Sequence, residues 1–119
     1  SGMKAGITGI GVDMVNISRM RRIVREKRER FIENTFSKEE RGYCFSHKDP
    51  APHLAGTFAA KEAVRKASAR YEAFADLEIR RTKAGRPEIW VRGRRQTSLL
   101  VSITHTDDLA CAIAIAKKV

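Results

Sequence analysis

The stretch APHLAGTFAAKEAVRKASAR (51–70) predicts the longest helix of the chain and decides the fold class. Its alanine-rich centre has a high intrinsic helix propensity, and Pro52 suits the first turn, where a backbone N–H is not needed. Gly56 inside the helix indicates close approach of a neighbouring element. At about 100° per residue, the helix is expected to present an apolar side and a polar arc. The arc consists of Thr57, Lys61, Arg65 and Ser68.

Strands are predicted before and after this helix. Alternating apolar residues and a high content of Ile and Val indicate an early strand that carries Asp13 near its end, a hairpin with Gly85 and Pro87 in its turn, and a final strand pair. The last strand has one face made only of alanines, which offers a smooth surface for the long helix. The strand segments are 5–15, 76–82, 88–93, 97–106 and 109–116.

Two further helices are expected in the first half of the chain. Ser18 is positioned to cap a helix that runs to about Phe31, with seven basic residues against two acidic ones between positions 19 and 30. Ser37 and Glu40 form a capping-box pattern for a short helix. The fold class is therefore α+β, with a mainly antiparallel sheet packed against a long central helix. We expect one domain over residues 1–119, with Ser1-Gly2 as a tag remnant.

Composition limits the possible partners. The 119 residues carry a net charge of +10, which favours nucleic acid, a phosphorylated ligand or an acidic protein. No membrane span or signal peptide is expected, so the interpretation is a cytoplasmic protein. Cys44 and Cys111 lack metal-ligand spacing, and two free thiols are expected in a reducing compartment.

Glu62 is the anomalous residue of the long helix. It falls in the middle of the expected apolar side, where an unpaired carboxylate is costly to bury. An intrahelical pair with Lys66, four residues on, is the ordinary explanation. A metal ion is the alternative, because Asp13 ends a glycine-rich strand that can approach a ligand closely. Two carboxylates with lysines nearby suit Mg²⁺ bridging phosphates.

Three segments resemble holo-acyl-carrier-protein synthases: GIGVDMVNISRM (9–20), LAGTFAAKEAVRKA (54–67) and SITHTDDLACAIAIA (102–116). The middle segment, with Lys61, Glu62 and Lys66, is the most specific, and GRPEI (85–89) and FSKEE (36–40) also match. The resemblance implies the phosphopantetheinyl transferase fold. It implies transfer of the phosphopantetheine arm of coenzyme A to a serine of an acidic apo acyl carrier protein, with release of adenosine 3′,5′-bisphosphate. A homotrimer with active sites between subunits is implied as well.

The same resemblance assigns roles to individual residues. Asp13 and Glu62 would bind Mg²⁺ and, with Lys66, make up the catalytic set. Two groups are candidates to accept the proton of the attacking serine: a carboxylate acting through water, and Lys66. Coenzyme A contacts are expected from Lys61, Lys66, Arg86, Pro87, His105 and Thr106. Carrier-protein contacts are expected from Arg19, Arg22 and Arg25.

The chain departs from the family pattern in three places. Thr57 stands where relatives commonly have Arg, which removes one basic contact. The segment SARYEAF (68–74) replaces a glycine-rich turn, with Arg70 as a candidate replacement contact. Thr104 stands where the last motif often has serine, and it keeps the hydroxyl group.

Two other function classes compete with the transferase. A small basic nucleic-acid-binding domain fits the net charge, but the sequence lacks an aromatic RNA-binding motif, zinc ligands and a clear helix-turn-helix, so nucleic acid is disfavoured. A noncatalytic carrier-protein-binding homologue would fit Thr57 and the altered turn.

Overall fold

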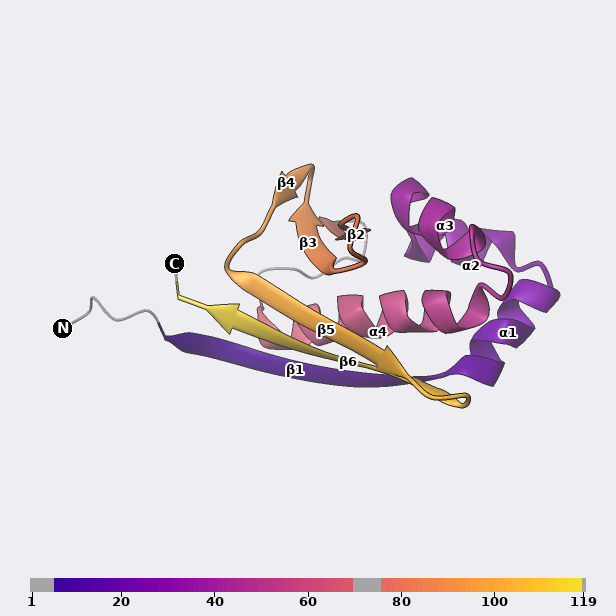
Figure 1. Ribbon diagram of the computed structural model, residues 1–119, viewed down its shortest axis with the longest axis horizontal. Helices are drawn as coiled ribbons and strands as arrows, with labels where there is room; N and C mark the ends of the chain where they lie inside the picture. Colours follow the sequence, from indigo (N-terminus) through magenta and orange to yellow (C-terminus); the bar gives the residue numbers. More distant parts are fainter. Residues whose placement is uncertain (1–5, 70–75, 119) are drawn as a thin grey trace.

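The long helix α4 (Ala51–Ala67) lies at the centre of the protein, with sheets on two sides of it (Figure 1). The structure is a computed structural model that describes residues 6–69 and 76–118. Outside the described residues lie Ser1-Gly2, the first residue of the expected early strand, and residues 70–74 of the SARYEAF segment, which include Arg70. Within them, the predicted α+β arrangement around a central helix is confirmed.

The first sheet is antiparallel and consists of β1 (Ile7–Asn16), β6 (Leu109–Lys117) and β5 (Leu99–His105), in the order β1-β6-β5. Its inner face packs on α4 through the alanines expected from the sequence, which are almost fully buried: Ala110, Ala112, Ala114 and Ala116. Side chains this small let the sheet lie close to the helix. The alanine surface predicted from the alternation is therefore confirmed.

Strand β1 approaches α4 so closely that side chains are excluded at two positions. A Cβ atom built on Gly9 would lie 1.8 Å from the carbonyl oxygen of Ala67, and one on Gly11 would lie 2.0 Å from that of Ala63. Only glycine is compatible with such contacts, because both neighbours are backbone atoms that cannot move aside. A Cβ atom built on Gly56 would lie 2.9 Å from a methyl group of Ile103. The close neighbour that a glycine inside this helix predicted is therefore present.

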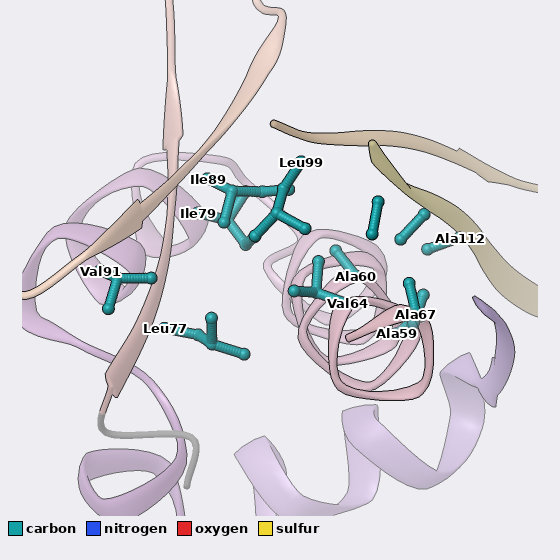
Figure 2. Packing of buried hydrophobic residues seen from close by; sticks show 13 residues of the cluster. Ala59, Ala60, Val64, Ala67, Leu77, Ile79, Ile89, Val91, Leu99 and Ala112 are labelled. Atoms are coloured by element: carbon teal, nitrogen blue, oxygen red, sulfur yellow. The ribbon is translucent and has the colours of Figure 1, made fainter. Parts of the chain in front are cut away.

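The second sheet is formed by β2 (Leu77–Arg81), β3 (Pro87–Val91) and the short β4 (Arg94–Arg95). The predicted β2–β3 hairpin is confirmed, and Gly85 in its turn has a φ of 86°. Pro87, which was also expected in the turn, is instead the first residue of β3 and pairs with Arg81. Figure 2 shows its apolar side chains facing α4 from the side opposite Ala112 of the first sheet. The helix is thus packed between the two sheets.

The basic segment is two helices, α1 (Ile17–Arg25) and α2 (Glu29–Thr35), so the single helix expected from Ser18 to about Phe31 is wrong. Lys27, with a φ of 53°, ends α1: its N–H bonds the carbonyl of Val24 and the next N–H bonds that of Ile23. This is a Schellman ending with lysine where glycine is usual, which explains why no sequence signal marked it. The N-cap is Asn16, whose side chain accepts from the Arg19 N–H, and not Ser18.

Helix α3 (Lys38–Phe45) begins with the capping box predicted for Ser37 and Glu40, which is confirmed by both of its hydrogen bonds. Helices α1 and α3 both contact α4, and α3 also contacts β2 of the hairpin (Figure 1). None of the helices among residues 6–69 and 76–118 is long and apolar enough to cross a membrane.

The polar arc expected on α4 is only partly correct. Thr57 and Lys61 are buried, because α3 and the hairpin cover that side of the helix. Glu62, expected in the middle of the apolar side, is instead partly exposed. The prediction failed because other elements surround most of the circumference of α4. The pattern of polar and apolar residues along this helix therefore does not indicate which side faces water.

Replacing Gly11 by alanine is expected to lower the free energy of unfolding by about 2 kcal/mol or more, because overpacking against backbone forces β1 away from α4. Gly42 is the matched control. A Cβ at this α3 position meets nothing within 4 Å, so Gly42→Ala should be neutral or slightly stabilising. Urea denaturation of both variants measures the difference. Equal stabilities would show that β1 and α4 can separate at little cost.

Candidate functional site

Asp13, Arg19 and Glu62 line one pocket of about 340 Å³ between β1, α1 and α4. Asp13 follows Gly9 and Gly11 on the same face of β1, so the close approach at the glycines also carries its carboxylate to the side of α4. Phe31 and Phe58 supply apolar walls. The convergence of the two carboxylates, which the sequence alone did not establish, is therefore present.

Each carboxylate is paired with one cation. The Lys66 ammonium donates to Asp13 Oδ1 at 3.2 Å and to the carbonyl of Val12 at 3.0 Å, while Arg65 donates to Glu62 Oε1 at 2.9 Å. The ordinary explanation, a Glu62–Lys66 pair, is wrong. Glu62 pairs instead with Arg65, and Lys66 pairs with Asp13 of β1. Arg65 was not among the expected site residues, although its i,i+3 spacing from Glu62 is a pattern that predicts such a pair.

The donor set of this pocket suits a hard divalent cation. The side chains of Asp13 and Glu62 are 17% and 28% exposed, which leaves both carboxylates accessible from the pocket. Among the described residues no group of three or more metal-ligating side chains comes together. Mg²⁺ is commonly held by one or two carboxylates, with water and substrate phosphates as its other ligands, so two carboxylates fit it.

A second pocket, of about 700 Å³, lies between the hairpin and β5. Arg86 and Pro87, expected to contact coenzyme A, line it together with Arg95 and Ser102. The two pockets share no lining residue. Within one chain, the expected metal ligands Asp13 and Glu62 therefore lie in a different pocket from the expected coenzyme A contacts Arg86 and Pro87.

His105 belongs to an aromatic cluster at the end of β5 and lines neither pocket. Its ring lies 6.3 Å from that of His53, which stacks on His47 at 3.6 Å. Burial lowers the pKa of His53, and the nearby positive groups of His47, His105 and Arg81 lower it further, against an opposing effect of Asp49. Thr106 is structural at this point, because its hydroxyl accepts from the N–H groups of Asp108 and Leu109 in the turn before β6.

Lys61 is not at the surface of either pocket. It is 1% exposed, and its ammonium donates to Glu40 Oε1 at 2.8 Å and to the carbonyl of Thr35 at 3.0 Å. The expected contact with the phosphates of coenzyme A is therefore not available to Lys61 in this structure. The sequence analysis recognised Glu40 only as a capping residue, and no spacing rule links positions 40 and 61.

Thr57 is also buried, with its hydroxyl donating to the carbonyl of His53 and lying 3.6 Å from the Cys44 sulfur. It makes no contribution to a ligand surface, so the loss of the family's arginine at this position is not compensated by Thr57 itself. Both cysteines are free, as predicted, and burial raises the pKa of the Cys44 thiol to about 11.

Helix α1 presents its basic residues outward, because Ile17, Met20 and Ile23 are buried beneath it. Arg19 faces the carboxylate pocket, and Arg22 and Arg25 are exposed in the last turn. Arg21 is engaged by Asp49 at 2.7 Å. The three arginines expected to contact a carrier protein thus lie on one exposed helix at the rim of the pocket.

The fold and this pocket define a class of protein: an α+β protein with two carboxylates and their paired cations in a pocket between a strand and a helix. Residues 9–114 match the family described as the 4′-phosphopantetheinyl transferase superfamily. The chain belongs to this superfamily, and the resemblance predicted from the three segments is confirmed.

Named relatives agree with this assignment. The chain is 36% identical over 111 residues to the holo-[acyl-carrier-protein] synthase of Thermodesulfovibrio yellowstonii, covering 92% of this chain and 97% of the relative. A crystal structure of the Bacillus anthracis synthase in complex with CoA (3′,5′-ADP) has a TM-score of 0.78 at 27% identity, covering 95% of this chain and 98% of that one. The Neisseria meningitidis synthase has a TM-score of 0.81 at 26% identity, covering 95% and 100%. The predicted phosphopantetheinyl transferase fold is confirmed.

Proposed function

We propose that this protein transfers the 4′-phosphopantetheine arm of coenzyme A to a serine of apo acyl carrier protein, giving the holo form and adenosine 3′,5′-bisphosphate. The observation that carries the proposal is the pocket shared by Asp13 and Glu62, with Lys66 and Arg65 beside them, in a chain of this family. The serine oxygen attacks one phosphorus of the pyrophosphate, and the bond from that phosphorus to the adenosine-side oxygen breaks.

Asp13 and Glu62 are the residues that hold Mg²⁺ in this proposal, and bound Mg²⁺ supplies positive charge against the pyrophosphate oxygens. Lys66 lies beside Asp13 and is half exposed, so its ammonium can turn from the carboxylate to a phosphate oxygen. Arg65 is placed in the same way beside Glu62. Cations fixed in advance around the reacting phosphorus stabilise the charge that develops as the bond breaks.

The rest of coenzyme A is assigned to the hairpin side of the protein. Arg86 and Pro87 line the pocket of about 700 Å³, and Arg95 adds a second guanidinium to it. His105 and Thr106 remain proposed contacts for the nucleotide end. Lys61 is left out of the contact set because of its burial.

The carrier protein is assigned to α1. Arg22 and Arg25 are exposed beside Arg19, which reaches into the carboxylate pocket. A basic helix at the rim attracts an acidic partner and directs its serine toward the metal-binding residues.

We assign a homotrimer, with each active site between two subunits. The outer face of the β1-β6-β5 sheet supports this assembly, because it exposes large apolar side chains: Ile10, Val12, Met14, Leu100, Leu109 and Ile113. A contiguous apolar face of this kind is typical of an interface between subunits. A site between subunits would also suit the separation of the two pockets, which share no lining residue within one chain.

The remaining assignments are a single domain and a cytoplasmic location. Both sheets share α4 as their packing partner, which supports one folding unit. Two free thiols suit a reducing compartment. The nucleic-acid-binding alternative is not favoured, since it leaves the convergence of Asp13 and Glu62 without a role.

Intact mass of a carrier protein tests the function. With coenzyme A and Mg²⁺, the wild-type protein should add one phosphopantetheine arm, and a chelator should abolish the gain until Mg²⁺ is restored. Glu62→Gln keeps size but loses charge, so turnover should fall about 100-fold or more. Glu33→Gln, an exposed change on α2, should leave turnover unchanged. A wild-type protein that binds coenzyme A but modifies no carrier protein would support the noncatalytic homologue instead.

Charge reversal on α1 tests the carrier-protein surface. Arg22→Glu/Arg25→Glu should raise the KM for apo carrier protein about 10-fold or more, with little change in kcat, and should flatten its dependence on salt. The control is Lys38→Glu/Arg94→Glu, which makes the same change in net charge on α3 and β4. An equal effect of the two double variants would mean that overall charge, and not α1, attracts the partner.

Replacement of Ile113 by aspartate tests the trimer. Ile113 lies at the centre of the outer apolar face, opposite Val12 on one side and Ser102 on the other, so a charge there should block burial of the face. Analytical ultracentrifugation should show monomers, with turnover lost in parallel. Phe45→Asp, at an equally exposed apolar position on α3, is the control and should remain trimeric. A trimeric Ile113→Asp protein would exclude this face.

A further inference from the structure

The buried ion pair of Lys61 and Glu40 connects the parts of the protein that carry the two halves of the proposed site. Glu40 Oε1 accepts from Lys61 of α4 and from the N–H of Ser37, while Oε2 accepts from the N–H of Ile79 in β2 at 2.7 Å. One carboxylate thus joins the start of α3, the long helix and the edge of the hairpin sheet.

The connection to the hairpin extends to its ligand-binding end. Ile79 is paired with Ile89 in the β2–β3 register, and the same register pairs Arg81 with Pro87. Pro87 and the neighbouring Arg86 line the larger pocket. A hydrogen bond to the Ile79 N–H therefore fixes β2, the strand that pairs with Pro87 and leads into the turn before Arg86.

The connection to the carboxylate pocket runs through α4. Adjacent helical residues point about 100° apart, so the direction of Lys61 sets the direction of Glu62. The Lys61 ammonium is held on the α3 and β2 side by Glu40 and the carbonyl of Thr35. Glu62 is then turned toward β1 and α1, where it lines the pocket with Asp13.

We propose that Lys61 is a positioning residue, paired with Glu40, that fixes the orientation of Glu62 and of the Arg86-Pro87 turn relative to each other. It does not contact the phosphates of coenzyme A. The burial of both partners supports the role: a buried pair is costly to break, because removal of one partner leaves an uncompensated charge, and so it holds one arrangement. This inference rests on the proposed transferase function.

The test is a double-mutant cycle of Lys61→Met and Glu40→Gln, with a calorimetric measurement of coenzyme A binding in the presence of a chelator and with kcat measured in Mg²⁺. Lys61→Met leaves the buried Glu40 carboxylate without its cation and should weaken binding and lower kcat, each about 10-fold or more. The double variant buries no charge, so it should recover most of both losses. Lys66→Met is the comparison: its defect should not be relieved by Glu40→Gln, because Lys66 is assigned to the phosphates.

A direct contact of Lys61 with phosphate predicts a different pattern. The double variant would then be as defective as Lys61→Met, and that result overturns the proposal. Glu40→Gln alone separates the two roles even if Lys61→Met does not fold. Positioning predicts weaker coenzyme A binding although the ammonium is intact, whereas unchanged or tighter binding overturns it. Wild-type protein is assayed in parallel to separate the two hypotheses. Absence of transfer by the wild type would contradict the proposed transferase function and not the positioning role of the Lys61–Glu40 pair.

Discussion

The structure depends on the contact of two backbones, that of β1 with that of α4. At Gly9 and Gly11 the strand lies against the carbonyl groups of Ala67 and Ala63 with no space for a side chain. The next residue on this face is Asp13, whose carboxylate accepts a hydrogen bond from Lys66 of the helix. The glycines and the carboxylate thus form one structural unit, since a wider separation at the glycines would carry Asp13 away from the pocket that it shares with Glu62.

Around α4, each side of the helix meets a different part of the protein. Ala59 and Ala67 lie toward the first sheet, and Val64 lies toward the hairpin (Figure 2). Lys61 is bonded to Glu40 of α3, and Glu62 lines the pocket. Because nearly all sides are occupied, rotation of the helix would disturb several contacts at once. Lys61 adds a directional constraint that apolar packing lacks, because a charge buried with two oxygen partners tolerates little displacement.

The sequence predicted those features whose cause is local. The hairpin around Gly85, the Ser37 capping box and the alanine face of β6 each follow from a turn, a cap or an alternation, and all are present. A metal site of Asp13 and Glu62 was one of the alternatives that the residues left open, and the family resemblance favoured it. The Glu40–Lys61 pair was missed because it joins positions 21 residues apart, and partners at that separation are chosen by packing. The break at Lys27 was missed because lysine replaces the glycine that usually marks it.

The arrangement of cations explains how a site with two carboxylates can exist before any ligand arrives. Asp13 and Glu62 would repel each other across a small pocket, yet each has its own partner, Lys66 and Arg65, on consecutive positions of α4. Both pairs are partly exposed, so water screens them and exchange of partners costs little free energy. In the proposed transferase, Asp13 and Glu62 would hold a divalent cation, and the side chains of Lys66 and Arg65 would turn to anionic oxygens. The buried pair of Lys61 and Glu40 differs from these two pairs, because both of its side chains are almost completely buried and each is hydrogen-bonded within the protein.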